Sequence, residues 1–319
     1  MILTEILNIM TGETIELPVI EQAGASSALL QETSLNQIRI VTEGAETLAD
    51  MYADKKTMTG NEGFLYHGQK LENYKIEIKN GYIHILDKDF NFKYGFFSLG
   101  NIKLKSDKNV TYVIWNILQK TACRFKTDFC DLHCYADQYP NTTRKNVVAR
   151  AKNLMLSTFS NFEEIFMEVI EIVNKIYGGT EIRIRIHESG DFYNNMYYNK
   201  IANVLNNSIY KNKALAYTKN IEVLPLLKFN EKHFNTRYSI MPDTSEEHQR
   251  EALKHECNYY ICLDDTLKGV AVPKCSMQCT TCNMCQNSNI KVIAVDVHGN
   301  RAQKAGEKKN KKRAPRKKV

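Results

Sequence analysis

Hydrophobic and polar residues alternate around one dipeptide in the first third of the chain. From residue 73 onward, NYKIEIKNGYIHIL alternates on both sides of Asn80-Gly81. Asn-Gly between two alternating runs favours a two-residue hairpin turn. The pattern therefore predicts a small antiparallel region over about residues 73–97. Residues 1–60 show weak periodicity, with one short helix expected at 45–54.

Helical and strand periods then follow each other over about 170 residues. Residues 162–177 repeat apolar side chains at helical spacing and end at Gly178-Gly179. EIRIRI at 181–186 has the two-residue period of a strand. A second amphipathic helix begins near Met196. Further strands are expected at 214–218, 237–241, 258–263 and 290–297, with a charged helix at 245–255.

Helices placed between strands predict a parallel sheet, either a complete or partial barrel or an open doubly wound sheet. We expect an α/β protein with a partial (β/α) barrel over residues 101–300. An N-terminal β-containing extension would occupy 1–100, and a cysteine-rich loop would lie near the C-terminus. Arg183 and Arg185 would face an anion in a barrel lumen, or water on an exposed sheet.

Positive charge is concentrated at the end of the chain. Residues 301–319 hold ten Lys and Arg and one Glu, a net +9, whereas the whole chain carries +7, so the rest carries −2. This composition without apolar periodicity predicts a disordered basic tail. The tail would bind nucleic acid through its phosphates, or would only promote solubility.

Nine cysteines occur in a chain with no apolar run of transmembrane length. The first residues lack the basic flank of a signal peptide, so we expect a cytoplasmic protein. Thiols stay reduced in that compartment, and clustered cysteines there indicate metal or redox chemistry. Cys257 and Cys262, in or beside an expected strand, are explained as buried free thiols, with Cys262 as a reserve ligand.

Three cysteines, Cys123, Cys130 and Cys134, have the spacing C-x6-C-x3-C. A structural zinc site needs four ligands, and His133 would have to supply the fourth. Three thiolates on one loop also suit a [4Fe–4S] cluster with one open iron. That arrangement is typical of radical S-adenosylmethionine (SAM) enzymes, in which SAM chelates the open iron.

A second group contains Cys275, Cys279, Cys282 and Cys285, within eleven residues. Its last three members have the x2-x2 spacing of bacterial ferredoxins, a loop that wraps a cubane. CxxC pairs also bind zinc. The group predicts an iron–sulfur site, with zinc as the alternative.

Polar residues follow the strand expected at 181–186, in the segment HESGDF. Chemistry in parallel α/β proteins collects at the carboxyl ends of strands. Asp191 or Ser189 would cap the next helix, but capping explains only one of these residues. The segment is therefore a candidate binding site.

Together these segments resemble the phage- and plasmid-borne gene product 88 family over roughly residues 95–287. The resemblance rests on NIKLKSD (101–107), CYA (134–136), YPN (139–141) with Arg144 and Asn153 downstream, HESGDF (187–192), AYTKN (216–220) and the late C-x2-C-x2-C. It implies a distant likeness to radical-SAM proteins, with one or two [4Fe–4S] clusters and SAM. The residues implied to bind this cofactor are Glu188, Ser189, Gly190, Asp191 and Arg185.

The chain departs from the radical-SAM pattern at three places. Its first cysteines are not spaced C-x3-C-x2-C, and His133 stands where an aromatic residue usually precedes the third cysteine. A Gly-Gly-Glu segment is missing after the strand at 181–186, where Glu188-Ser189-Gly190 would take its role.

Three functions remain open from the sequence. The first is a radical-SAM-type enzyme of a mobile genetic element that acts on or with nucleic acid, with the second cluster auxiliary. The second is a nucleic-acid-binding iron–sulfur protein whose clusters are structural or redox-sensing. The third is a zinc-stapled binding module. No membrane partner is expected, and the pattern does not indicate an oligomeric state.

Overall fold

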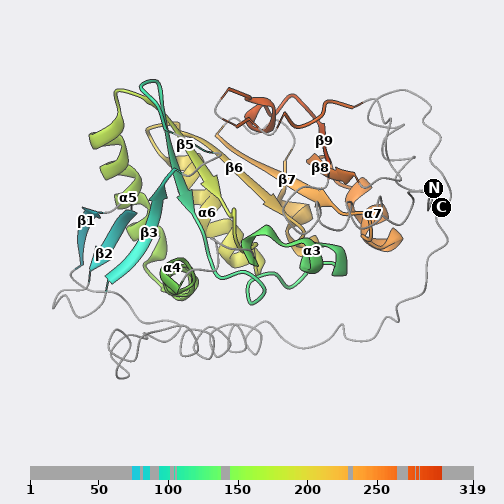
Figure 1. The fold of residues 1–319 in the computed structure, drawn as a ribbon, viewed down its shortest axis with the longest axis horizontal. Helices are drawn as coiled ribbons and strands as arrows, with labels where there is room; N and C mark the ends of the chain where they lie inside the picture. The colour runs from blue at the N-terminus through green and yellow to red at the C-terminus, as the bar shows by residue number, and fades with distance from the viewer. Residues whose placement is uncertain are drawn as a thin grey trace, which may run out of the picture.

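The computed structural model describes residues 74–79, 82–86, 93–100, 104, 106–137, 144–228, 233–263, 272–276, 278–279 and 281–296. These residues form one mixed sheet whose nine strands lie side by side in chain order (Figure 1). The strands are β1 (Lys75–Lys79), β2 (Tyr82–Leu86), β3 (Lys93–Leu99), β4 (Val110–Trp115), β5 (Glu181–Ile186), β6 (Lys213–Thr218), β7 (Phe234–Ile240), β8 (Asn258–Leu263) and β9 (Val292–Asp296).

Helices lie mainly in the connections that follow β4. They are α3 (Asp128–His133), α4 (Arg144–Leu156), α5 (Phe162–Tyr177), α6 (Asn195–Asn207) and α7 (Glu246–Leu253), with the short 3₁₀ helices η2 (Tyr135–Asp137), η3 (Ile221–Leu226) and η5 (Met284–Gln286). The helix expected at 45–54 and the basic tail at 301–319 lie outside the described residues.

The first four strands are antiparallel. β1 pairs with β2 so that Lys79 lies opposite Tyr82, which confirms the hairpin expected around Asn80-Gly81. β3 continues the antiparallel ladder to β4. The boundary expected near residue 100 therefore falls between two neighbouring strands of one sheet.

The remaining ladder, from β4 to β9, is parallel throughout. The strands expected after residue 180 are all present, with ends that differ by a few residues. The α/β class is confirmed, but the sheet does not close into a barrel: β1 and β9 are its two edges. The six parallel strands belong to one open sheet, and the expected likeness to a partial radical-SAM barrel stays a prediction.

One strand was missed by the sequence pattern. VTYVIW of β4 is buried along its whole length, so it shows no alternation of apolar and polar residues. Continuous apolar runs are typical of strands covered on both faces. β4 is also the strand that begins the parallel ladder.

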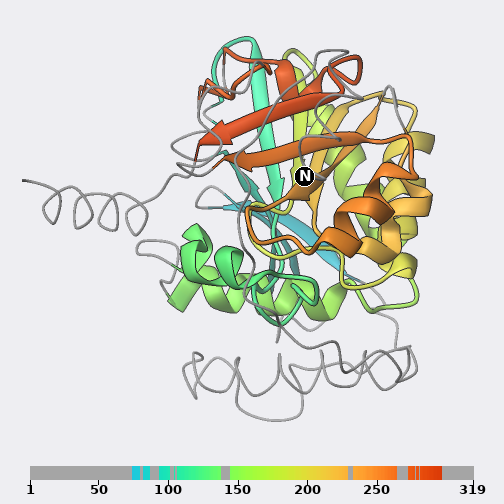
Figure 2. The same ribbon diagram turned by 90° about the vertical axis from the view of Figure 1, so that its right-hand side faces the viewer.

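Helices α4–α7 and one face of the strands share a single apolar core. Six residues of α5 are buried at helical spacing, because every third or fourth side chain faces the sheet. Trp115 is fully buried in this core, with ring centroids 4.5 Å from Phe96 and 5.7 Å from Phe166. In Figure 2 the yellow and orange helices stand to one side of the strands.

The opposite face of the parallel strands is rich in polar side chains. A small apolar cluster of Val110, Tyr112, Ile114 and Leu104 covers only its β4 end. The two-residue period of strands places on this face Arg183, Arg185, Tyr217, Asn235, Arg237, Asn258 and Tyr260. Among the described helices, none combines the length and apolar character needed to cross a membrane.

The core predicts a clear contrast between two isoleucines. Ile184 in β5 is 1% exposed, whereas Ile176 in α5 is 53% exposed. Ile184→Ala should lower the free energy of unfolding by about 2–5 kcal/mol, because it removes buried methyl groups and leaves a cavity. Ile176→Ala should change it by less than about 0.5 kcal/mol. Urea unfolding measures both, and equal losses would contradict this core.

Candidate functional site

The first cysteine group lies on the connection that leaves β4. Cys123 precedes α3, Cys130 lies within this helix, and Cys134 follows it directly. The helix begins at Asp128, directly after its N-cap Thr127. The Thr127 side chain accepts a hydrogen bond from the Cys130 backbone N–H at 3.1 Å. The group therefore occupies the carboxyl end of the first parallel strand.

This cysteine loop is fastened to later parts of the chain. Lys120 Nζ lies 2.8 Å from Asp137 Oδ2, which joins the two ends of the loop. The Phe129 backbone N–H donates to Asp243 Oδ2 at 2.6 Å, and Arg124 pairs with Glu222 at 3.5 Å. These contacts hold α3 across the carboxyl ends of β6 and β7 (Figure 1).

Cys130 lies within electrostatic reach of both Cys123 and Cys134. Burial raises the pKa of Cys123 to about 12, and Cys130 adds to that rise. Burial also raises the pKa of Cys134, again with a contribution from Cys130. In the described part of the chain, however, no three His, Cys, Asp or Glu side chains are close enough to hold one metal ion.

The HESG segment after β5 packs against the loop that leads to Cys123. The Ser189 backbone N–H donates to Asn116 Oδ1 at 2.9 Å, and its carbonyl accepts from the Ile117 N–H at 3.1 Å. Gly190 has a φ of +90°, and a Cβ there would lie 2.4 Å from Ile117 Cγ1. Ser189 and Gly190 thus position the loop through backbone contacts.

Asp191 connects the ends of β5 and β6. Its Oδ1 accepts from the Phe192 N–H at 2.7 Å, and its Oδ2 accepts from the Lys219 N–H at 2.8 Å. Burial raises the pKa of this carboxyl, while Lys219 and these hydrogen bonds oppose the rise. Both oxygens of Asp191 are therefore used within the protein.

His187 turns toward the helices instead of the polar face. It is 3% exposed, has a φ of 57°, and its Nε2 lies 2.8 Å from Tyr197 Oη. That hydroxyl also accepts a hydrogen bond from Trp115 Nε1 at 2.6 Å, so Tyr197 joins His187 to the core tryptophan. Burial holds the pKa of His187 well below its ordinary value, and the ring is a neutral core group.

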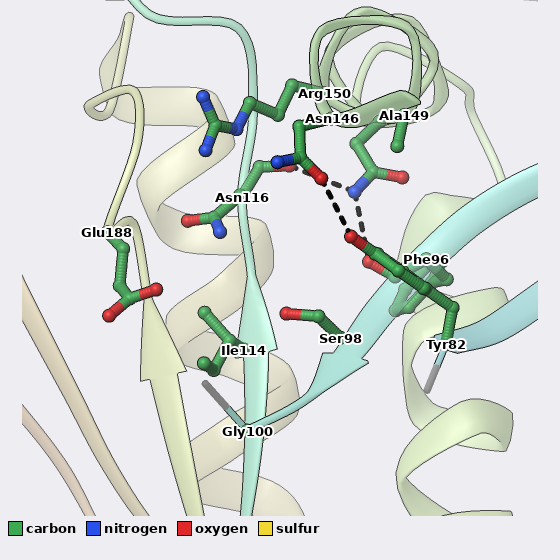
Figure 3. A pocket seen from close by; sticks show the side chains of 11 residues that line it. Tyr82, Phe96, Ser98, Gly100, Ile114, Asn116, Asn146, Ala149, Arg150 and Glu188 are labelled. Atoms are coloured by element: carbon green, nitrogen blue, oxygen red, sulfur yellow. Dashed lines mark hydrogen bonds between the residues drawn. The ribbon is translucent and has the colours of Figure 1, made fainter. Parts of the chain in front are cut away.

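A polar pocket of about 130 Å³ opens between the ends of β3, β4 and β5 and helix α4. Glu188, Asn116 and Arg150 extend into the same space from three different elements (Figure 3). Arg150 Nη1 donates to Gln119 Oε1 at 3.2 Å, and the Ala136 carbonyl lies 3.5 Å from it. The pocket is therefore adjacent to both sides of the first cysteine loop.

Asn153 contributes an acceptor to this pocket. Its Nδ2 donates to the carbonyls of Phe96 and Asn116, both at 2.9 Å. Its Oδ1 is buried and has no hydrogen-bond partner. An unused buried acceptor is costly, and a ligand that donates hydrogen bonds would remove that cost.

The second cysteine group lies against the polar face of the parallel strands (Figure 1). Arg237, which is fully buried in β7, holds it. Its guanidinium donates to the carbonyls of Cys285, Ile290 and Asn287 at 3.0, 2.8 and 2.9 Å, and to Met284 and Tyr259 at 3.2 and 3.5 Å. One planar side chain thus fixes the backbone of residues 284–290.

Two further side chains place the rest of this segment. Tyr112 Oη donates to the Cys279 carbonyl at 2.8 Å, and Asn235 Nδ2 donates to the Cys285 carbonyl at 2.8 Å. Arg183 Nη1 in turn donates to Tyr112 Oη at 3.1 Å and is 4% exposed. Arg183 therefore faces neither water nor an open lumen.

Cationic and phenolic groups surround the thiol of Cys285. Burial raises its pKa, whereas a hydrogen bond from Tyr217 and the charges of Arg237 and Arg185 oppose the rise. The Arg185 guanidinium lies 4.0 Å from the centre of the Tyr217 ring, and its Nη1 is buried without a hydrogen-bond partner. Arg185 thus belongs to the second cysteine group and not to the pocket.

The structure separates the residues that were expected to bind a cofactor. Glu188 lines the pocket, Ser189, Gly190 and Asp191 fix backbone segments around it, and Arg185 lies elsewhere. Cys257 and Cys262 are buried, as expected, at 0% and 9% exposure. Sequence reasoning missed Arg150, Arg237 and Lys219. Only Lys219 had a signal, because it lies in the AYTKN segment at a strand end.

The role of Arg237 can be tested by a change that keeps its charge. Arg237→Lys replaces five fixed donors by a compact ammonium, so several buried carbonyls lose their partners. We expect the free energy of unfolding to fall by roughly 3–5 kcal/mol, from two or more charged hydrogen bonds. Protease cleavage within residues 284–290 should also become faster.

Arg250→Lys is the matched control, because Arg250 forms an exposed pair with Glu246 at 3.1 Å. Its effect should stay below about 0.5 kcal/mol. If both variants unfold alike, Arg237 does not anchor the cysteine segment.

Comparison with known proteins gives one match. The family model described as gene product 88 matches residues 96–307. No curated protein and no solved structure matches the chain. The matched range begins in β3 and includes the parallel ladder, both cysteine groups and every pocket-lining residue except Tyr82. The chain therefore belongs to the gene product 88 family.

Proposed function

We propose that this protein is an iron–sulfur enzyme of the radical-SAM type. The observation that carries the proposal is the position of the first cysteine group. Three thiols leave the carboxyl end of β4, the first of six parallel strands in chain order. Catalytic groups of parallel α/β proteins collect at this end.

The donor set favours a cluster over a single ion. Cys130 influences the pKa of both Cys123 and Cys134, and among the described residues no group of His, Cys, Asp and Glu side chains fits one metal ion. A tetrahedral zinc site holds each thiolate sulfur about 2.3 Å from the ion, so its sulfur atoms must also lie close to one another. A cubane is larger and accepts thiolates that are further apart.

The pocket beside the first group fits the amino-acid end of SAM. Its volume of about 130 Å³ is below the about 300–1,000 Å³ of sites for larger ligands, so it would hold only part of the molecule. Glu188 and the free Asn153 Oδ1 would accept from an ammonium group, and Arg150 would donate to a carboxylate. A ligand that uses all three groups must carry an ammonium and a carboxylate close together, as the amino-acid end of SAM does.

When bound, the cluster and SAM supply one-electron cleavage of the sulfonium bond and a radical that takes hydrogen from a substrate. The residues of this chain would bind and orient the groups and exclude water. Ser189 and Gly190 keep the cysteine loop beside the pocket through their contacts with residues 116–117. The second group would be auxiliary.

A second candidate is a nucleic-acid-binding iron–sulfur protein without SAM chemistry. The net +9 of residues 301–319 favours it, because such a run neutralises phosphates without reading sequence. If the substrate of the enzyme is a nucleic acid, residues 301–319 would bind its phosphates in the same way.

Metal analysis of anaerobically purified protein tests the cofactor. We expect about eight irons with matching sulfide per chain and an absorption shoulder near 400 nm, as two cubanes give. Cys130→Ser should leave about four irons, those of the second group. Treatment with dithionite and SAM should release 5′-deoxyadenosine. Iron without that product would leave the second candidate, and zinc without iron would leave a zinc-stapled binding module.

The pocket predicts a specific loss of SAM binding. Glu188→Gln removes one charge that would face the ammonium group, so the dissociation constant for SAM should rise roughly tenfold or more. Calorimetric titration of the iron-loaded protein measures this change. Glu247→Gln, an exposed position in α7, is the charge-matched control. Equal affinity in both variants would remove Glu188 from the binding site.

A further inference from the structure

The segment that follows β5 orients an amide in the polar pocket. The Ser189 backbone N–H donates to Asn116 Oδ1 at 2.9 Å. Because its oxygen is occupied in this way, the amide presents its NH₂ group on the other side. Asn116 lines the pocket, and its side chain lies in the same space as the carboxylate of Glu188 (Figure 3). Within the described residues, Asn116 Nδ2 makes no hydrogen bond, so it offers a ligand two donors.

The same segment also helps to hold Arg150, which enters the pocket from α4. Gln119 Oε1 lies 2.9 Å from Ser189 Oγ and accepts from Arg150 Nη1 at 3.2 Å. The Gln119 amide is itself fixed, because its Nε2 donates to the Ala136 carbonyl at 3.3 Å and to Asp137 Oδ1 at 3.1 Å. Arg150 is 7% exposed. Ser189 therefore contributes to the placement of two donor groups of one pocket.

Ser98 adds a hydroxyl group from the neighbouring strand. It lies opposite Ile114 in the antiparallel pair of β3 and β4, two residues before Asn116. Directly opposed residues share a face of the sheet, and so do residues two apart along a strand. Ser98 lines the pocket, and its side chain points toward the space that Asn116 and Glu188 also face (Figure 3).

The groups around this space are mostly donors. A guanidinium and an amide NH₂ group can only donate, and a hydroxyl group can donate as well as accept. Glu188 supplies the opposite character, because an ionised carboxylate only accepts. A ligand carboxylate would pair with the donors, and a ligand ammonium would pair with Glu188. The pocket volume of about 130 Å³ leaves room for little more than these two groups.

We propose that Asn116 and Ser98 are specificity-determining residues, which make the pocket select ligands that carry a carboxylate beside the ammonium group. Together with Arg150 they would bind the carboxylate. This inference rests on the proposed function for the identity of the ligand, SAM, but none of its contacts involves a cysteine or a metal. An amine without the carboxylate leaves the donors unpaired, and unpaired polar groups in a site are costly.

Two ligands that differ only in this group test the selection. Decarboxylated SAM keeps the ammonium and sulfonium groups of SAM and lacks the carboxylate. Calorimetric titration of the anaerobically purified full chain at pH 8, where carboxylates are ionised, gives a dissociation constant for each ligand. The wild-type protein should bind SAM roughly tenfold or more tightly than decarboxylated SAM, because at least one charged hydrogen bond distinguishes them.

Asn116→Asp replaces the donor by an acceptor of nearly the same shape. One oxygen of the new carboxylate can still accept from the Ser189 N–H, and the other places a negative charge where Nδ2 lies. The dissociation constant for SAM should rise roughly tenfold or more, whereas that for decarboxylated SAM should fall or stay within about threefold.

Ser98→Ala removes the hydroxyl group alone. It should weaken SAM binding roughly twofold to tenfold and leave the binding of decarboxylated SAM unchanged. If Asn116→Asp does not fold, as judged by circular dichroism, this variant carries the test. Asn207→Asp is the charge-matched control, because it is an exposed position at the end of α6, which contributes no residue to the pocket. It should change neither constant.

The outcomes separate this inference from the proposed function. Equal affinity of the wild-type protein for the two ligands overturns the inference, as does wild-type SAM affinity in a folded Asn116→Asp variant. Iron content and release of 5′-deoxyadenosine report on the proposed function independently. Selection for the carboxylate in a protein without iron would support the inference and remove the iron–sulfur enzyme. A wild-type protein that binds neither ligand overturns both.

Discussion

The arrangement of this protein follows from one constraint, the order of its parallel strands. Neighbours in the sheet are also neighbours along the chain from β4 to β9. Crossover connections are right-handed in nearly all proteins, so connections that all advance in one direction place their helices on one face. The apolar core shared by α4–α7 is the result. Among the described residues the other face carries no α-helix, only the short 3₁₀ helix η5, and arginine, tyrosine and asparagine side chains gather there.

Two cysteine-containing segments pack against the parallel strands at different places. The loop after β4 crosses the carboxyl ends, where it is tied by Asp243 and Glu222. The segment around Cys285 lies on the polar face, where Arg237 bonds its carbonyls. β6 and the residue after it lie near both segments. Tyr217 in β6 interacts with Cys285, and Lys219, which directly follows the strand, interacts with the first cysteine group. Side chains two residues apart share one face of a strand, about 7 Å from each other.

The sequence predicted much of this fold because periodicity reports which faces are buried. In EIRIRI of β5, the isoleucines such as Ile184 face the core and the arginines such as Arg183 face the polar side. In α5 the apolar residues recur at helical spacing and form one buried stripe. β4 was not predicted because it is buried on both faces, so its sequence shows no alternation of apolar and polar residues. The open edges of the sheet could not be predicted either, since closure depends on the geometry between strands that are far apart in sequence.

The candidate site was predictable only where residue type carries the signal. Cysteine spacing marks both groups because few roles other than metal binding require thiols so close together. Arg150 and Arg237 carry no such mark. The sequence does not distinguish either from the other arginines. Their roles depend on backbone carbonyls of residues distant in sequence, which the fold places beside their guanidinium groups. Glu188 was identified, but its separation from Asp191 depends on the positive φ of Gly190, which turns the chain between them.

The ties of the first cysteine loop have a consequence for how the protein is made. The partners that fix this loop, Ser189, Glu222 and Asp243, are all later in the chain than its cysteines. Translation proceeds from the N-terminus at about 5–20 residues per second. The three thiols therefore leave the ribosome well before the groups that arrange them. The loop therefore reaches its final arrangement only after β7 and the residues that follow it have been synthesised.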